Sequence, residues 1–178
     1  MSARGHVAGM TLPELLVTLA VAAILVVGGT EWLPRVVQQS RMVTEVNRFT
    51  AALHLARSEA IKRDRRVVLC PSRDSDHCGS SLDWPTGWLL FASDDRERDP
   101  SEPLLQAGTL MGSGISLRSG SQRSRIVYYP DGSSGGSNAT FTFCDRHHRT
   151  RPRVICLSNT GRPRLSLTAC NGRAVQCP

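Results

Sequence analysis

A helical pattern that runs from residue 10 to beyond residue 60 constrains this chain more than any other feature. Its first part, MTLPELLVTLAVAAILVVGGT (residues 10–30), holds 21 residues with a single charge, Glu14. About 20 apolar residues suffice to cross a bilayer as a helix. A cleaved secretory signal would also begin in this way. However, a glutamate within an apolar run is costly in a membrane, and the helical pattern does not stop where a signal would end. We therefore expect residues 10–33 to form a membrane-spanning helix.

A single apolar stripe continues the helical pattern after that segment. Its members alternate between spacings of four and three residues, as one face of an α-helix requires; they are Met42, Val46, Phe49, Leu53, Ala56 and Ala60. Pro34 removes one backbone donor and predicts a bend. We expect one helix of about fifty residues, its first half in a membrane and its second half, residues 34–66, packed on a domain.

The segment GMTLPELL, residues 9–16, resembles the processing site of type IV pilins and pseudopilins. In that site a glycine precedes a hydrophobic residue, threonine, leucine, a variable position, glutamate and leucine. The resemblance implies cleavage between Gly9 and Met10 by a prepilin peptidase that also methylates the new amine. It also implies that Glu14 meets the N-terminal amine of a neighbouring subunit during filament assembly. Met10 stands where the family usually has phenylalanine, and Pro13 fits the first helical turn.

Short strands separated by turn-rich segments are predicted after the helix. The candidates are residues 65–72, 84–93, 115–117, 126–129, 139–144, 154–158 and 164–168. A long helix followed by antiparallel strands defines the fold class as α+β. We expect a leader at 1–9, the membrane half of the helix at 10–33, its amphipathic half at 34–66, a β-rich globular domain at 67–168 and a cysteine-containing tail at 169–178.

Five segments in order are similar to the minor-pilin family of FimT and GspH: ALHLARSEAIKRDRRVVLCPS, GWLLFASDDRERDPSEPLL, IVYYPDGSSG, TFTFCD and VICLSNTGRPR. The resemblance implies a type IV pilin-like fold, with the long helix packed on an antiparallel β-sheet. It implies anchoring in a bacterial inner membrane with a periplasmic globular domain, followed by assembly into an extracellular pilus. The implied partners are major and other minor pilins and the prepilin peptidase.

Positive charge is concentrated at the C-terminal end of the chain. The formal net charge is +7, and residues 145–178 contribute +6 of it, with seven arginines against one acid, Asp145. Because Lys62 is the only lysine, the cation is almost always a planar guanidinium, which suits two-pronged contacts to phosphate or carboxylate. The arginines are Arg146, Arg149, Arg151, Arg153, Arg162, Arg164 and Arg173.

The stretch TGRPRLS, residues 160–166, has the composition of an anion-binding turn. Gly161 lets the backbone turn and Pro163 holds it extended, so Arg162 and Arg164 should point the same way. No aromatic residue follows Phe143, so base stacking is not supported, and backbone contacts to double-stranded DNA are favoured. A solvated basic surface is the alternative.

Within the resembled family, FimT-like members active in natural transformation carry a G-R-x-R motif that binds DNA. Residues Gly161, Arg162, Pro163 and Arg164 match it in sequence and in place. We therefore predict binding of extracellular DNA, without sequence specificity, through Arg162 and Arg164. Four further arginines are expected to assist: Arg149, Arg151, Arg153 and Arg173. The rival functions are a purely structural minor pilin, a type II secretion pseudopilin, or an adhesin for anionic surfaces.

The six cysteines form three pairs that are local in sequence. Even, spaced cysteines behind an export signal indicate disulfides in an oxidising compartment. The spacing favours Cys70 with Cys78, Cys144 with Cys156, and Cys170 with Cys177, although sequence alone does not fix the connectivity. A zinc site of Cys144, His147, His148 and Cys156 is the alternative, but its spacing is not standard.

No catalytic motif or cofactor-binding motif is present in the sequence. The chain lacks a G-x-S-x-G elbow, an H-E-x-x-H pair and a phosphate-binding loop, so we predict neither an enzyme nor a cofactor. The acidic segment DDRERDPSE, residues 94–102, lacks the glycine and the alternating ligands of a calcium loop, and a solvated turn is favoured.

Overall fold

The computed structural model describes residues 10–80, 84, 87–93, 100, 104–109, 114–120 and 123–177, without the side chains of residues 26–31. The chain divides into two compact units, residues 1–37 and residues 38–178. The acidic segment 94–102 lies outside the described residues except for Pro100. Gly9, on the leader side of the predicted cleavage site, also lies outside them.

Helix α1 spans Leu12–Arg63 and includes Pro34, so the single long helix expected from the sequence is confirmed. In the first unit its apolar side chains are exposed, among them those of Leu12, Leu16 and Ile24. Within the part of the chain that is described, no helix is long and apolar enough to cross a membrane. The predicted membrane span at 10–33 is therefore not confirmed.

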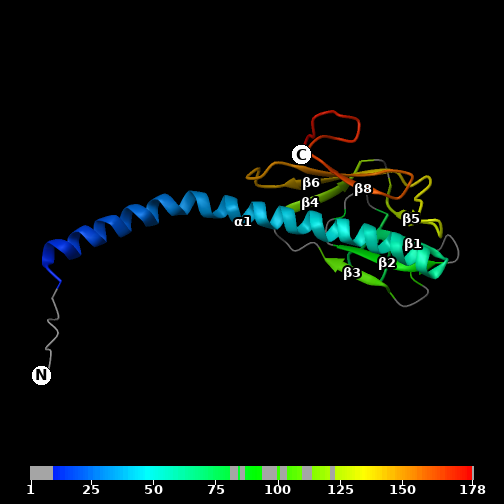
Figure 1. Cartoon of the computed structure of the whole chain (residues 1–178), viewed down its shortest axis with the longest axis horizontal. Helices are drawn as coiled ribbons and strands as arrows, with labels where there is room; N and C mark the ends of the chain where they lie inside the picture. Colours follow the sequence, from blue (N-terminus) through cyan, green and yellow to red (C-terminus); the bar gives the residue numbers. More distant parts are fainter. Residues whose placement is uncertain are drawn as a thin grey trace, which may run out of the picture. The chain divides into compact units, whose positions relative to one another are not determined.

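The second unit contains two four-stranded antiparallel sheets in addition to the second half of α1. Sheet A has the order β3-β2-β1-β5, formed by Gln106–Thr109, Gly87–Ser93, Arg66–Pro71 and Ile126–Tyr128. Sheet B has the order β4-β6-β7-β8, formed by Ile115–Ser119, Ala139–Asp145, Arg153–Leu157 and Pro163–Ser166. Figure 1 shows α1 running alongside the strands of both sheets in this unit.

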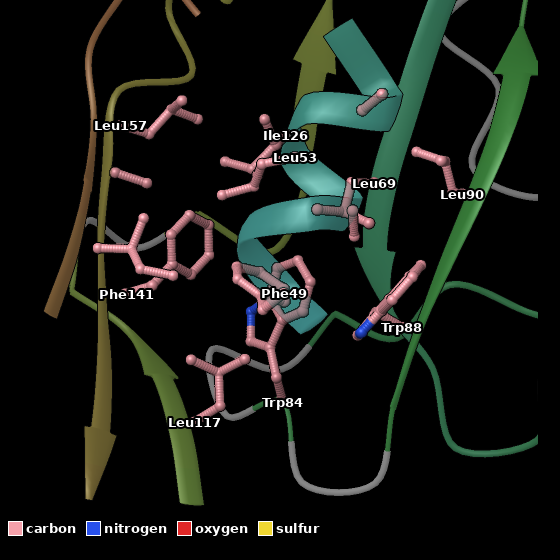
Figure 2. Close-up of a cluster of buried hydrophobic side chains, with 14 of the residues drawn as sticks. Phe49, Leu53, Leu69, Trp84, Trp88, Leu90, Leu117, Ile126, Phe141 and Leu157 are labelled. Carbon is pink, nitrogen blue, oxygen red and sulfur yellow. The ribbon is translucent and has the colours of Figure 1, made fainter. Parts of the chain in front are cut away.

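The main core lies between the helix stripe and the two sheets. All six predicted stripe residues are buried, and they cluster with inward-facing residues of both sheets. Phe49 is at the centre, with edge-to-face contacts to Trp84 at 5.3 Å and to Phe141 at 4.8 Å between ring centroids. Figure 2 shows Phe49 and Leu53 between Phe141 on one side and Leu69 on the other. The helix is thus the element on which both sheets pack.

Seven strands coincide with the strands that the sequence predicts, within a few residues at their ends. The eighth, β3, was not predicted because its sequence, QAGT, has neither alternation nor β-branched residues before its last position. It pairs with β2 through Gly108 opposite Trp88, where a Cβ atom on the glycine would collide with the indole ring. Tertiary pairing, rather than local propensity, makes this segment a strand.

All six cysteines form disulfides, but two of the three predicted pairs are wrong. Cys70–Cys78 is confirmed, whereas the other bonds are Cys144–Cys177 and Cys156–Cys170. Cys156 lies opposite Thr140 in the ladder of β6 and β7, four residues from Cys144. That is about 13 Å along a strand, too far for a disulfide.

The two remaining bonds attach the C-terminal tail to sheet B. Phe141 and Ile155 face the core, so by strand alternation Cys156 lies on the opposite side of the sheet, which we call the outer face. The tail therefore crosses this outer face, bonded to β7 through Cys170 and to β6 through Cys177. Figure 1 shows the red tail beside the strands of sheet B.

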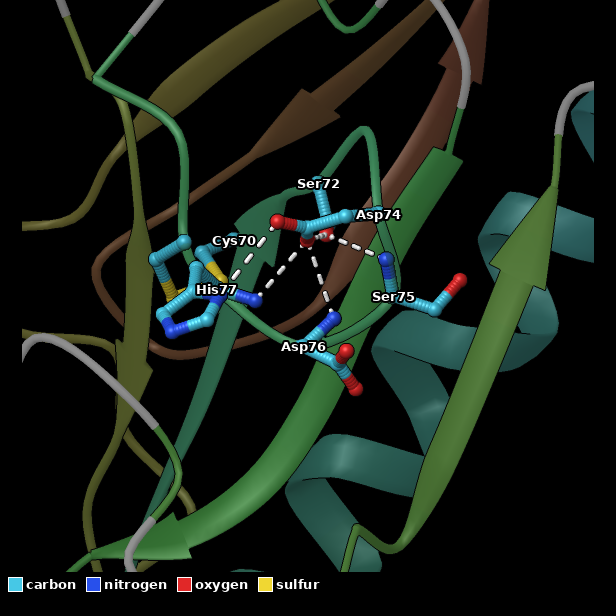
Figure 3. Close-up of a disulfide and its surroundings, with 7 residues drawn as sticks. Cys70, Ser72, Asp74, Ser75, Asp76 and His77 are labelled. Carbon is cyan, nitrogen blue, oxygen red and sulfur yellow. Dashed lines mark hydrogen bonds and ion pairs between the residues drawn. A yellow bond between two sulfur atoms is a disulfide. The ribbon is translucent and has the colours of Figure 1, made fainter.

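The Cys70–Cys78 disulfide closes a short loop that is ordered by its own side chains. The Asp74 carboxylate accepts hydrogen bonds from the backbone N–H groups of Asp76 and His77, both at 3.0 Å, and Ser72 Oγ accepts one from the N–H of Ser75 (Figure 3). These N–H groups hold the pKa of Asp74 well below its usual range. The disulfide and these hydrogen bonds thus order the loop that follows β1.

The packing of Phe49 yields a test of the fold. Replacing Phe49 with alanine leaves a cavity against Trp84 and Phe141, and we expect the free energy of unfolding to fall by about 3–5 kcal/mol. His54→Ala, an exposed change on the same helix, should cost less than about 0.5 kcal/mol. Chemical denaturation of both variants checks this, and equal losses would contradict the proposed core.

Candidate nucleic-acid interface

The turn between β7 and β8 is formed by residues 158–161. The N–H of Gly161 donates to the Ser158 carbonyl oxygen at 2.9 Å, and Gly161 has a φ of 73°, in the left-handed region where glycine is strongly favoured. The hydroxyls of Ser158 and Thr160 hydrogen bond at 2.7 Å. The prediction that Gly161 lets the chain turn is confirmed.

The segment that joins β5 to β6 supports this turn. Ser134 is fully buried; its N–H donates to the Asn159 carbonyl oxygen at 2.9 Å and its hydroxyl to the Ser158 carbonyl oxygen at 2.8 Å. A Cβ atom on Gly161 would collide with the carbonyl oxygen of Gly132. The turn is thus held at a fixed position by the segment that joins β5 to β6.

The two arginines of the motif leave this turn into solvent. Arg162 is exposed and precedes β8, Pro163 begins the strand, and Arg164 is the next residue and is also exposed. Arg164 lies opposite Cys156, which places it on the outer face of sheet B. Gly161 is buried, so the motif presents its two charges from a buried anchor.

The tail brings a third arginine to the same face. A turn at residues 169–173 is closed by the Ala169 N–H, which donates to the Arg173 carbonyl oxygen at 2.9 Å. Cys170 in this turn is bonded to Cys156, the cross-strand neighbour of Arg164. The exposed Arg173 follows Cys170 by three residues, and the disulfide of Cys170 places that cysteine beside Arg164.

Arg149 and Arg151 are exposed as well, but they belong to the loop that joins β6 to β7. This loop precedes β7 and the motif turn follows it, so the two groups lie at opposite ends of one strand. Four residue steps of β7 separate the ends by about 13 Å.

Asp145, the one acid in the basic region, orders that second loop. It is buried, and its carboxylate accepts hydrogen bonds from the N–H groups of His147, Arg149 and Thr150 at 3.0, 2.9 and 3.0 Å and from Gln38 Nε2 at 3.1 Å. Burial acts to raise the pKa of Asp145, but these hydrogen bonds outweigh it and hold the pKa below its usual value. The loop is positioned by a buried ionised carboxylate.

Arg153 is placed differently from the other predicted arginines. It lies opposite Phe143 in the ladder, so it is on the face of sheet B that meets the helix. Its side chain is half-buried, and Nε is buried without a hydrogen-bond partner among the described residues. Arg153 therefore does not share the outer face with Arg164.

The zinc alternative is excluded by the disulfides, because Cys144 and Cys156 have no free thiol. Among the described residues, no group of histidine, cysteine and acidic side chains could hold a metal ion. The outer face presents exposed guanidinium groups on a fixed backbone, and a guanidinium group has the geometry for a two-pronged contact to a phosphate. Sequence reasoning missed Ser134, Gly132 and Asp145, whose only signal was a turn-rich segment and a lone acid among arginines.

At the N-terminus, Met10 precedes α1 and Glu14 lies in the first turn of the helix. Both residues are exposed. A carboxylate at a helix N-terminus is favoured by the helix dipole, and among the described residues the Glu14 carboxylate has no hydrogen bond or ion pair. The charge is thus accessible to another molecule.

A long N-terminal helix whose second half packs on antiparallel sheets is the type IV pilin-like fold. Residues 45–161 match the family described as type II transport protein GspH, and residues 4–30 match the prokaryotic N-terminal methylation motif. The chain belongs to the GspH family, and it is a pilin-like protein. No curated protein matches it significantly.

Two crystal structures of the type IV minor pilin FimU from Pseudomonas aeruginosa are similar to this fold. The first has a TM-score of 0.60 and 19% identity, covering 75% of this chain and 96% of FimU. The second has a TM-score of 0.54 and 21% identity, covering 75% and 98%. At this identity the likeness concerns the fold.

The Asp145 network predicts a pH-dependent loss of stability. Asp145→Asn puts an amide NH₂ among donors, and we expect it to lower the free energy of unfolding by about 1–3 kcal/mol near neutral pH. Because the folded pKa is depressed, the carboxylate stabilises the fold above its unfolded pKa and loses this effect as pH falls through the folded value. The free energies of unfolding of wild type and Asp145→Asn are measured by denaturation at pH 7 and at pH 3, on either side of the ordinary aspartate pKa of about 3.9. The difference between them should be smaller at pH 3. An unchanged difference would contradict this role; Asp64→Asn, at an exposed carboxylate, is the control.

Proposed function

We propose that this protein is a minor type IV pilin that binds extracellular DNA during DNA uptake for natural transformation. One observation carries the proposal: Arg162 and Arg164 are both exposed and leave a turn whose buried Gly161 is fixed against Gly132. The site uses Gly161 and Pro163 for backbone geometry and the two arginines for contact. Double-stranded DNA is the proposed ligand.

Preorganisation of the motif turn favours the binding of phosphate groups. Arg162 and Arg164 are separated by Pro163 in extended chain, where alternate residues share a side, so two guanidinium groups can meet neighbouring phosphates. The turn is ordered before binding, which reduces the entropy lost on association. Such contacts are independent of sequence and weaken with salt.

The other predicted arginines receive different roles. Arg173 is proposed to extend the primary surface, because its turn is attached beside Arg164. Arg149 and Arg151 are proposed as a secondary contact for a duplex that extends along the domain. Arg153 has no part in the proposed DNA contact, because it lies on the helix-facing side of sheet B.

The N-terminal segment supports incorporation into a pilus. The methylation motif at residues 4–30 fits cleavage between Gly9 and Met10 by a prepilin peptidase. The exposed apolar side chains from Met10 to Leu25 need a lipid or protein environment. We propose that this segment is held in the inner membrane, with the globular domain in the periplasm, and then in the filament, where Glu14 meets a neighbour's amine.

The rival function is that of a structural subunit, either a minor pilin that primes filament assembly or a type II secretion pseudopilin. The match to the GspH family favours a structural subunit as directly as it favours a DNA-binding pilus subunit. Neither kind of structural subunit needs an anion-binding face. A strain lacking the protein separates the two: loss of transformation with filaments retained supports DNA uptake, and loss of all filaments supports the structural role.

Binding of duplex DNA should depend on the two motif arginines. For the full chain, Arg162→Ala/Arg164→Ala should weaken binding by about tenfold or more near physiological salt and reduce the slope of log K against log salt by about 2, since two phosphate contacts are lost. Titration of a labelled duplex at several salt concentrations measures both quantities.

The matched control is Arg73→Ala/Arg123→Ala, which removes the same charge from two exposed positions elsewhere in the same unit. It should change the affinity by less than about threefold, the residual long-range electrostatic effect. Equal losses in the two double variants would show that net charge, and not the motif, binds DNA.

A further inference from the structure

We propose that a groove between α1 and the edge of sheet B binds an extended segment of another subunit, one that carries a carboxylate among apolar side chains. The groove has a volume of about 340 Å³ and is distinct from the outer face with its arginines. Its lining is Val43, Val46 and Asn47 from the helix, Arg153 from β7, and Leu165, Ser166 and Leu167 from and after β8.

The rim of the groove is apolar and exposed. Leu165 is 54% exposed and Leu167 is 61% exposed, although both are large aliphatic side chains, and Val43 across the groove is 42% exposed. Covering such side chains removes apolar area from water, at about 25 cal/mol per Å². These three residues therefore favour a partner that is itself apolar at this point.

The backbone of β8 favours an extended partner. Among the described strands, β8 is at the edge of sheet B and pairs only with β7. An edge strand presents unpaired N–H and C=O groups that can accept a further strand. A chain added along β8 would place alternate side chains over the groove and against Val43 and Asn47.

Arg153 specifies the charge of the partner. Its Nε is buried and has no hydrogen-bond partner among the described residues, although a buried donor left unpaired costs about 1–3 kcal/mol. The guanidinium group of Arg153 is also the only charge among the residues that line the groove, so an incoming carboxylate would meet it with a charge-assisted hydrogen bond. An amide or a cation at the same position would bind less well.

The probe is a fluorescent, end-blocked peptide of alternating valine and threonine with one central glutamate, tested against its glutamine counterpart. The protein is the full chain in phospholipid nanodiscs, and anisotropy reports binding. We expect the dissociation constant of the glutamate peptide to be about tenfold lower. Arg153→Gln should abolish this difference, and Leu167→Asp, at an exposed position, should weaken binding of both peptides.

Two controls keep the result specific. Arg162→Ala/Arg164→Ala should retain the preference for glutamate, because those arginines lie outside the groove; loss of the preference there would overturn the assignment. An unchanged thermal midpoint of Arg153→Gln shows that the fold is intact. The proposal would also be overturned if the native chain bound neither peptide. It would likewise be overturned if the fatty acid decanoate bound in the groove while both peptides failed to bind, because the groove would then be a site for a lipid chain.

Discussion

Phe49 packs edge-to-face against Trp84 and Phe141, and the rest of the domain depends on this contact between the helix and the two sheets. The stripe to which Phe49 belongs is the surface on which both sheets bury their inner faces. Because alternation along a strand then fixes which residues face outward, the same packing decides that Cys144, Cys156 and Arg164 lie on the outer face of sheet B. The arrangement of the outer face is a consequence of the core.

The outer face is shaped by covalent bonds and by one tight backbone contact. Two disulfides attach the tail to β6 and β7 and so carry Arg173 to the neighbourhood of Arg164. Gly161 fits against Gly132 where any side chain would collide. Small domains of exported proteins often rely on such bonds, and here they also organise a charged surface.

The sequence was most informative where one physical pattern dominated. The stripe from Met42 to Ala60 predicted the long helix and its buried face, and alternation predicted most strands. The pairing of Cys144 could not be read in the same way, because it depends on the register of β6 against β7 and on the path of the tail, neither of which leaves a local signal. For the same reason Arg153 and Arg164, only eleven residues apart, fall on opposite faces of one sheet.

We propose that the motif turn, and not the basic region as a whole, contacts DNA. Arginine-specific dicarbonyl labelling of the full chain, read residue by residue by mass spectrometry with and without a saturating DNA duplex, tests it directly. We expect DNA to slow the labelling of Arg162 and Arg164 most strongly and to leave the labelling of Arg73 and Arg123 unchanged. Protection confined to Arg149 and Arg151, or spread equally over all exposed arginines, would contradict it.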